Sequence, residues 1–107
     1  MTLDQIQMRA MKKANQSICR YKVSAVGFDK KGRMIGTACN RPRFSKEGGS
    51  IHAEMRLMSQ YKENLKTIII CRINDGGELK PIDPCLACAT KAKELGIKIV
   101  SINCPLV

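Results

Sequence analysis

The sequence is poor in aromatic residues and has no long apolar run. Its 107 residues contain no Trp, two Tyr and two Phe. So few rings exclude a long stacking platform for single-stranded nucleic acid, because such platforms stack successive bases on aromatic side chains. No apolar run approaches the roughly 20 residues of a membrane-spanning helix. The start of the chain has neither the basic residues nor the apolar centre of a signal peptide, so we expect a cytoplasmic protein without a membrane partner.

Repeats, linkers and low-complexity segments are also absent, which predicts one domain over residues 1–107. The hydrophobic content of 44% is ordinary for a globular domain of this length with a single core. Two of the six cysteines form a Cys-x-x-Cys pair. The other four stand singly among apolar neighbours, as buried free thiols do, and do not indicate a disulfide framework. They are Cys19, Cys39, Cys71 and Cys104.

Acidic residues are scarce, and the resulting charge is unevenly distributed. The chain has 19 Lys and Arg against nine Asp and Glu, a formal net charge of +10. Residues 1–46 contain eleven of the basic residues and only two acids, whereas residues 47–107 contain eight and seven. A basic half of this kind attracts the phosphates of a nucleotide or a nucleic acid. A solvated surface kept soluble by its charge explains the same composition.

Periodicity and turn-forming residues predict an α/β fold. Thr2 and Gln5 form a capping box for the first helix, and the turn at 29–32 joins the first two strands as a hairpin. Ser50 is expected to cap the second helix, and Thr67–Ile73, apolar on both faces, to form a central strand. The predicted elements are a helix at 3–18, strands at 21–28 and 34–39, a helix at about 51–62, a strand at 67–73, a helix at about 85–95 and a strand at 97–102.

This order, αββαβαβ, places one sheet between helices. Each strand–helix–strand unit implies a right-handed crossover, so the later strands are expected to pair in parallel. Asn40-Arg41-Pro42 ends the second strand, because proline interrupts the ladder and asparagine favours turns. Ile18 is expected on the apolar face of the first helix, and Gly96 caps the third helix.

One histidine and two cysteines have the spacing of a metal site: His52 and the pair Cys85 and Cys88. One nitrogen and two sulfur ligands suit zinc, and three protein ligands leave the fourth position for water, which is the catalytic arrangement. The two cysteines are three apart in the first turn of a predicted helix, so they lie on the same face. Glu54 is not needed as a ligand and is available to move protons. The sequence therefore predicts a catalytic zinc site.

Two alternatives account for the same cysteines. One is a closed structural zinc site whose fourth ligand is Cys39, Cys71 or Cys104. None of these belongs to a second Cys-x-x-Cys pair, and such a site has no use for Glu54. The other alternative is a redox-active cysteine pair, which does not explain the neighbouring His-x-Glu.

Two stretches resemble the cytidine/deoxycytidylate deaminase superfamily of zinc-dependent base deaminases, which includes the tRNA adenosine deaminases. They are Asn40-Arg41-Pro42 with His52-Ala53-Glu54, and Asp83-Pro84-Cys85-Leu86-Ala87-Cys88-Ala89. The resemblance extends from the first hairpin to the last strand and implies a three-layer α/β sandwich with a mixed sheet. It further implies zinc on His52, Cys85 and Cys88, with Glu54 as the proton shuttle and Asn40 holding the substrate.

Substrate contacts are expected from these motifs and from the loop between them. Phe44 is expected to stack on a base or close over it, and Arg41, Arg43 and Lys46 to hold a phosphate. Taken without the resemblance, Asn40 is a turn former and Phe44 is a loop residue packed against the surface. The expected substrate-binding residues are Asn40, Arg41, Arg43, Phe44, Ala53 and Pro84.

The expected function is hydrolytic deamination of a cytosine base in a nucleoside, nucleotide or nucleic acid. Asn40-Arg41-Pro42 with His52-Ala53-Glu54 is most similar to the tRNA-editing branch, so adenine in RNA or tRNA is the alternative base. The segment from Cys88 to Lys98 is more similar to the deoxycytidylate branch. A basic zinc-dependent nucleic-acid-binding module without turnover is the second hypothesis. Family members usually continue past the last strand with a further helix and strand, whereas this sequence stops at Val107. A homo-oligomer is expected to cover the open sheet edge.

Overall fold

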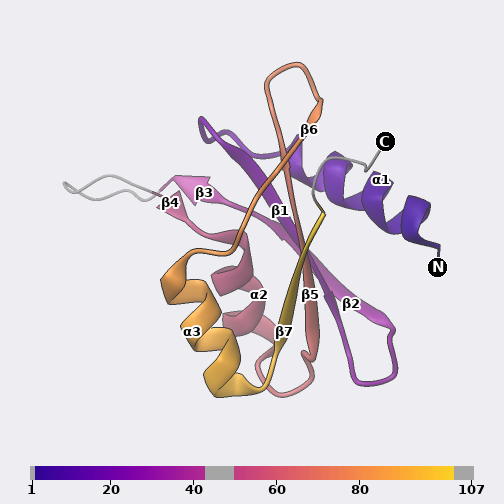
Figure 1. The fold of residues 1–107 in the computed structure, drawn as a ribbon, viewed down its shortest axis with the longest axis vertical. Helices are drawn as coiled ribbons and strands as arrows, with labels where there is room; N and C mark the ends of the chain where they lie inside the picture. The colour runs from indigo at the N-terminus through magenta and orange to yellow at the C-terminus, as the bar shows by residue number, and fades with distance from the viewer. Residues whose placement is uncertain (1, 43–49, 103–107) are drawn as a thin grey trace.

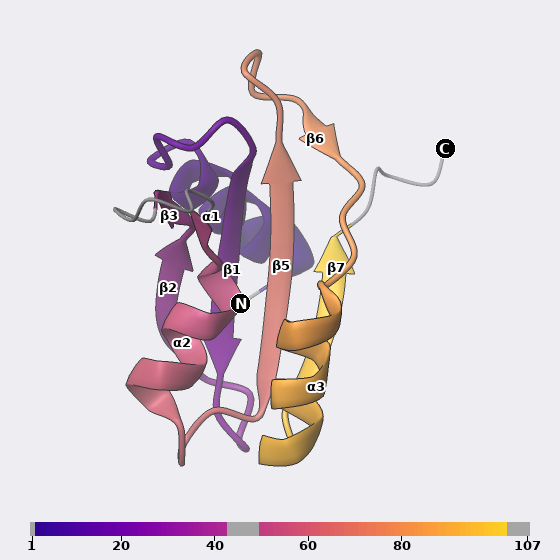
Figure 2. The ribbon, with the colours of Figure 1, turned by 90° about the vertical axis from the view of Figure 1, so that its left-hand side faces the viewer.

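The computed structural model describes residues 2–42 and 50–102, in which one sheet lies between two layers of helices. The elements are α1 (Leu3–Ala14), β1 (Lys22–Phe28), β2 (Met34–Cys39), β3 (Arg41–Pro42), β4 (Ser50–Ile51), α2 (Ala53–Tyr61), β5 (Thr67–Ile73), β6 (Leu79–Lys80), α3 (Leu86–Leu95) and β7 (Lys98–Ile102). Helices α2 and α3 cover one face of the sheet and α1 covers the other (Figure 1, Figure 2). The predicted three-layer α/β architecture is confirmed. None of the described helices is long and apolar enough to cross a membrane.

The sheet is mixed and is centred on β5. Strand β1 pairs antiparallel with both β2 and β5, while β7 pairs parallel with β5. The predicted parallel pairing is therefore right for β5 and β7. It is wrong for β2 and β5, because the hairpin places β1 between them. The short strand β6 pairs antiparallel with the end of β5, in a segment where the sequence indicated only a loop.

Each face of the sheet has its own apolar core. Alternate residues of β5 point to opposite faces, as the strand period requires. Ile68 and Ile70 pack with Leu57 and Leu65 beneath α2 and α3. On the other face, the fully buried Cys71 packs with residues of α1. Burial raises the pKa of the Cys71 thiol to about 11, so it stays neutral at physiological pH.

Several predicted helix boundaries need correction. Helix α1 begins at the Thr2–Gln5 capping box as predicted but ends at Ala14. Ile18, expected on its apolar face, is 81% exposed because the helix has already ended. Ser50 does not cap α2, since it pairs with Pro42 in the β3–β4 ladder. The cap position belongs to His52 instead. Helix α3 and its Gly96 cap, with a φ of 71°, are as predicted.

The cysteines outside the Cys-x-x-Cys pair do not all match the expected buried thiols. Cys71 is buried, as predicted. Cys19 and Cys39 are only partly buried, so the prediction is wrong for these two. Cys104 lies outside the described residues.

Gly27 in β1 lies beneath two fully buried leucines, Leu57 and Leu65. A Cβ at this position would lie 2.6 Å from Cδ1 of Leu65, well inside the ~3.5–4.0 Å at which carbons pack. The Gly27→Ala variant is therefore expected to lose about 1–3 kcal/mol of unfolding free energy, measured by urea denaturation. The matched control is Gly76→Ala in an exposed turn, where an added Cβ meets only ordinary contacts. Equal losses in the two variants would contradict this packing.

Candidate metal centre and substrate pocket

The first half of the site is the N-terminal end of α2. His52 is the N-cap residue, with an extended backbone at φ −70° and ψ 146°, and its side chain makes no capping hydrogen bond. The imidazole is therefore not used in capping and is available to another partner. Glu54 lies in the first turn and is only 3% exposed. The helix end thus presents a histidine and a buried carboxylate to the same region.

The second half is the N-terminal end of α3. Cys85 is the N-cap residue, and its Sγ accepts a hydrogen bond of 3.4 Å from the backbone N–H of Cys88. Cys88, in the first turn, is completely buried. The positive end of a helix dipole favours the thiolate form of cysteines placed there. The N-termini of two helices therefore meet at the site.

The three predicted ligands face one another. Nδ1 of His52 lies 3.2 Å from Sγ of Cys85 and 3.4 Å from Sγ of Cys88. Their ligand atoms all lie within 4.8 Å of one another, and no other His, Cys, Asp or Glu in residues 2–42 and 50–102 joins the group. Tetrahedral zinc with Zn–N of about 2.0 Å and Zn–S of about 2.3 Å places its N and S ligands roughly 3.5 Å apart. The donor set and its spacing therefore fit a zinc ion.

The electrostatics of the group also favour a cation. Burial, and then the negative charge of Glu54, raise the pKa of the Cys88 thiol, and the adjacent Cys85 adds to the effect. A thiolate here therefore needs a nearby positive charge, which a bound divalent ion supplies. Cys39 and Cys71 are not in the ligand group, so neither provides the fourth ligand of a closed structural site.

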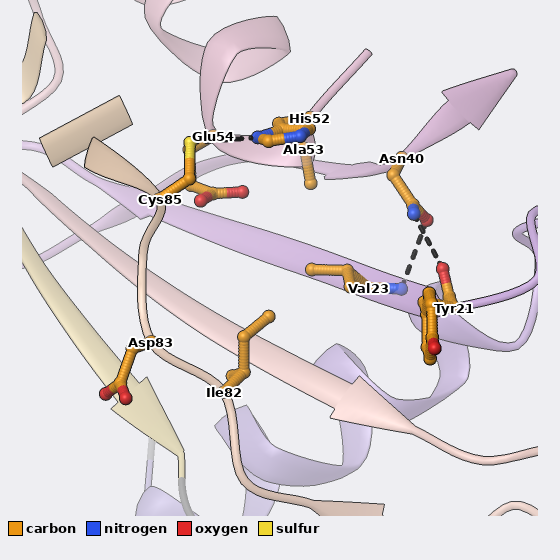
Figure 3. Close-up of a pocket in the computed structure, with 9 residues that line it drawn as sticks. All are labelled: Tyr21, Val23, Asn40, His52, Ala53, Glu54, Ile82, Asp83 and Cys85. Carbon is orange, nitrogen blue, oxygen red and sulfur yellow. Dashed lines mark hydrogen bonds between the residues drawn. The ribbon is translucent and has the colours of Figure 1, made fainter. Parts of the chain in front are cut away.

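A cavity of about 210 Å³ opens beside the three ligands (Figure 3). Glu54 contributes its carboxylate to the wall, close to His52 and Cys85, while Tyr21 and Asn40 lie at the far end. The lining residues are Tyr21, Val23, Asn40, His52, Ala53, Glu54, Ile82, Asp83 and Cys85. A small molecule in this cavity would therefore contact the ligand group and the buried carboxylate together.

Asn40 is held rigidly in the wall of this cavity. Its Oδ1 accepts hydrogen bonds from the Ser17 hydroxyl, at 2.6 Å, and from the backbone N–H of Val23, at 3.1 Å. Its Nδ2 donates to the carbonyl oxygen of Tyr21 at 2.6 Å. These backbone partners, a donor on one side and an acceptor on the other, fix the orientation of the amide. The second Nδ2 hydrogen is left for a molecule in the pocket.

Arg56 connects the two sides of the pocket. It lies on α2, one turn after His52, and its Nη1 donates a 2.7 Å hydrogen bond to the carbonyl oxygen of Cys39. Cys39 directly precedes Asn40 in the chain. One side chain therefore fixes the helix that presents His52 and Glu54 relative to the strand end that presents Asn40.

Replacing Arg56 with Met is expected to lower the unfolding free energy by about 1–2 kcal/mol, because the Cys39 carbonyl loses a charged donor. Urea denaturation measures the loss, and Arg56→Lys should recover part of it. The control is Lys62→Met, an exposed cation at the end of α2. A loss for Lys62→Met as large as that for Arg56→Met would argue against a specific role for the bond.

The structure brings together most, but not all, of the residues predicted for the site. His52, Glu54, Cys85 and Cys88 meet as expected, and Asn40 and Ala53 line the cavity. Arg41, exposed in β3, and Pro84 are not among the lining residues, so their substrate roles stay predictions. Arg43 and Phe44 lie outside the described residues.

Four lining residues were not predicted from the sequence. Asp83 stands two residues before Cys85, inside the motif itself, so its position was a signal that could have been used. Tyr21 is one of only four aromatic residues, which is a weaker signal. Val23 and Ile82 are ordinary apolar residues. The strand register brings Val23 to the pocket, and Ile82 lies in the segment between β6 and α3.

Comparisons with known proteins agree with this geometry. A family model described as the cytidine and deoxycytidylate deaminase zinc-binding region matches residues 1–104. The fold is similar to that of the cytidine deaminase from Mycobacterium leprae, with a TM-score of 0.67 and 21% identity over 94% of this chain and 88% of that one. The cytidine deaminase from Mycobacterium tuberculosis gives a TM-score of 0.67 and 18% identity, covering 96% and 86% of the two chains.

The comparison with curated proteins found no match. The family assignment therefore rests on the family model, which spans nearly the whole chain, while the solved structures show the same fold. His52, Cys85 and Cys88 are positioned to bind the zinc ion that the family's description names. The chain belongs to the cytidine and deoxycytidylate deaminase zinc-binding family.

Proposed function

We propose that the protein is a zinc-dependent hydrolytic deaminase of a cytosine base. The observation that carries the proposal is the buried Glu54 carboxylate in the pocket wall, beside three residues arranged to hold zinc. A site that only binds metal has no use for a buried acid that is not a ligand. The two cytidine deaminases with this fold support cytosine as the base.

The chain's own residues supply binding, orientation and proton transfer. His52, Cys85 and Cys88 would hold the zinc, which would supply the Lewis acidity that lowers the pKa of a water molecule towards neutrality. Glu54 takes a proton from the attacking water as its oxygen bonds to C4 of the ring. It passes this proton to the ring nitrogen N3, then takes the second proton from the oxygen now bonded to C4 and delivers it to the exocyclic amine. The C4 carbonyl forms as the C4–N bond breaks and ammonia leaves.

The rest of the pocket orients the substrate. The fixed amide of Asn40 offers one N–H donor at the end of the cavity away from His52. With the base at the Glu54 end, this donor is placed for the sugar. Val23 and Ile82 provide apolar walls between the two ends. Such a pocket, mostly apolar with a few fixed polar groups, is typical of small-molecule sites.

A basic zinc module that binds nucleic acid without turnover is the alternative class. A groove of about 550 Å³ beside α1 is lined by Arg9, Lys12 and Lys13, on the face of the sheet opposite to the pocket. Lysine and arginine in such a groove are suited to phosphate contacts, and the resulting binding would weaken steeply with salt. Adenine in RNA or tRNA is the alternative base, because the same chemistry acts at C6 of adenine.

One experiment separates these functions. Purified protein is analysed for zinc and screened for ammonia release from cytosine, cytidine, deoxycytidine, dCMP, adenosine and short oligonucleotides. We expect one zinc per chain and ammonia from a cytosine compound. Release only from adenosine or RNA would identify the alternative base. Salt-dependent oligonucleotide binding with no ammonia from any compound would identify the binding module.

The homo-oligomer expected from the sequence stays a proposal. Between α2 and α3, on the surface of the domain, lies a groove of about 240 Å³ lined by Met55, Met58 and Leu95, among other residues. Apolar residues in such a groove are suited to contact with a second copy. Sedimentation at micromolar concentration tests it, and a strict monomer would rule it out.

A further inference from the structure

Arg72 lies beside the pocket although it does not line the cavity. It follows Ile68 and Ile70 on β5 at two-residue spacing, so its side chain is on the face that α2 and α3 cover. Its partner across the antiparallel ladder is Val23, which lines the pocket. Directly opposite residues in such a ladder have their side chains on the same face, side by side. Arg72 is therefore adjacent to the pocket wall.

The guanidinium of Arg72 has an unusual environment. Its central carbon lies 4.6 Å from the centroid of the Tyr21 ring, and the guanidinium carbon of Arg20 lies 5.8 Å from the same ring. Nε of Arg72 is buried and has no hydrogen-bond partner, and the side chain makes no ion pair within the described residues. Nearly all buried polar groups in proteins are paired, so this unpaired charged donor is unusual.

The position of Tyr21 links this donor to the substrate. In Figure 3, His52, Glu54 and Cys85 lie at one end of the pocket, and Tyr21 lies with Asn40 at the other. The cavity of about 210 Å³ is smaller than the ~300–1,000 Å³ typical of sites that enclose a whole ligand. With the base at the Glu54 end, the sugar and any group on its 5′ carbon would therefore lie at the Tyr21 end, beside Arg72.

We propose that Arg72, stacked on Tyr21, binds the phosphate of a 5′-nucleotide substrate; this rests on the proposed deaminase function. A guanidinium presents its N–H donors in a planar fork that matches two phosphate oxygens, and the unpaired Nε is part of that fork. The ring of Tyr21 holds the guanidinium plane in place by a cation–π contact. The substrate class is thus a nucleoside monophosphate in preference to a nucleoside.

The charged residues around Arg72 favour the binding of a phosphate. Lys80 is its partner on β6, and Arg20 lies over the same tyrosine, so three cations surround the Tyr21 end. Asp83 also lines the pocket but lies away from Tyr21 (Figure 3), and no ion pair joins it to Arg72 within the described residues. The net charge at this end is positive, which attracts the dianionic phosphate and gives little advantage to a neutral nucleoside.

The test compares ligands that differ only in the phosphate. The kcat/KM for ammonia release is measured for cytidine and deoxycytidine and for their 5′-monophosphates, at constant ionic strength. The wild-type protein is expected to prefer the monophosphates roughly 10- to 100-fold, as hydrogen bonds to a charged partner provide. In Arg72→Gln the ratio of kcat/KM for the monophosphates to kcat/KM for the nucleosides should fall to near unity, with the zinc content unchanged.

Two further variants complete the design. Arg72→Lys keeps the charge and most of the stem but loses the fork, so it should retain only part of the preference. If Arg72→Gln does not fold, Arg72→Lys provides the test in its place. Lys98→Gln removes an exposed cation paired with the opposite end of β5 and should leave the preference intact.

The outcomes separate the two proposals. Turnover of nucleosides with no gain from the phosphate, or a gain that survives Arg72→Gln, overturns the phosphate site and leaves the deaminase function standing. Failure of the zinc-loaded protein to release ammonia from any cytosine compound overturns the deaminase function, and the phosphate site with it. A preference for the monophosphates that is lost in Arg72→Gln and kept in Lys98→Gln supports both the phosphate site and the deaminase function.

Discussion

Replacing Glu54 with Gln is expected to abolish ammonia release while leaving zinc content and folding unchanged. The residues positioned to bind zinc are His52, Cys85 and Cys88, so the amide of glutamine disturbs none of them. Glutamine is close to glutamate in size and fits the same buried position. Only the capacity to accept and deliver protons is lost. General acid–base groups contribute roughly 10²- to 10⁴-fold to rate, so kcat should fall by at least that much.

The measurement is kcat for the substrate that the wild-type protein turns over, together with zinc per chain and a melting curve. Glu63→Gln is the matched control, because this glutamate is exposed just after α2 and is not in the ligand group. It should keep full activity. Turnover within a few-fold of wild type in Glu54→Gln would show that another group moves the protons. A loss of zinc would mean that Glu54 holds the metal site together.

Changing Cys88 to Ser is expected to remove the zinc and much of the stability of the domain. A metal that binds only the folded state stabilises it by mass action, about 4 kcal/mol when free zinc is 1,000 times its dissociation constant. Cys88 is also completely buried in the core beneath α3. Its replacement by serine therefore adds the cost of a buried hydroxyl to the loss of the metal.

Cys85→Ser separates these two contributions. Cys85 is only partly buried, so its replacement should remove the zinc with a smaller packing cost. Zinc per chain is measured by atomic emission, and unfolding free energy by urea with and without a chelator. The chelator should destabilise the wild-type protein and have no further effect on either variant. Cys19→Ser, outside the ligand group, should behave as wild type. Zinc retained in both site variants would contradict the assigned ligands.

The sequence predicted the metal centre well because its signals are local. Two short motifs contain all three ligands and Glu54, and each motif lies at a helix N-terminus. Helix starts and stops set by a few neighbouring residues were also right, as at the Thr2 capping box and Gly96. The exceptions are the end of α1, which comes at Ala14 and not at residue 18, and Ser50, where pairing with Pro42 in a short ladder took precedence over its capping tendency.

The walls of the pocket could not be predicted, because they depend on contacts between distant segments. Val23 and Arg72 become neighbours only through the register of β1 against β5. The insertion of β1 between β2 and β5 was missed for a related reason. A strand–helix–strand pattern fixes the direction of the second strand but not which strand it pairs with. The role of Asn40 as a rigid part of the wall likewise depends on Ser17, 23 residues earlier.

The position of Tyr21 gives the protein a built-in optical probe. The chain has no tryptophan, so its near-ultraviolet emission comes from two tyrosines, Tyr21 and Tyr61. Tyr61 packs against Gly36, outside the pocket lining, whereas Tyr21 lines the pocket with its ring beside the Arg72 guanidinium. A molecule that enters the cavity changes the surroundings of one fluorophore and leaves the other as it was. Ligand entry can therefore be followed in the unlabelled protein, on the timescale of a stopped-flow instrument and before any chemistry occurs.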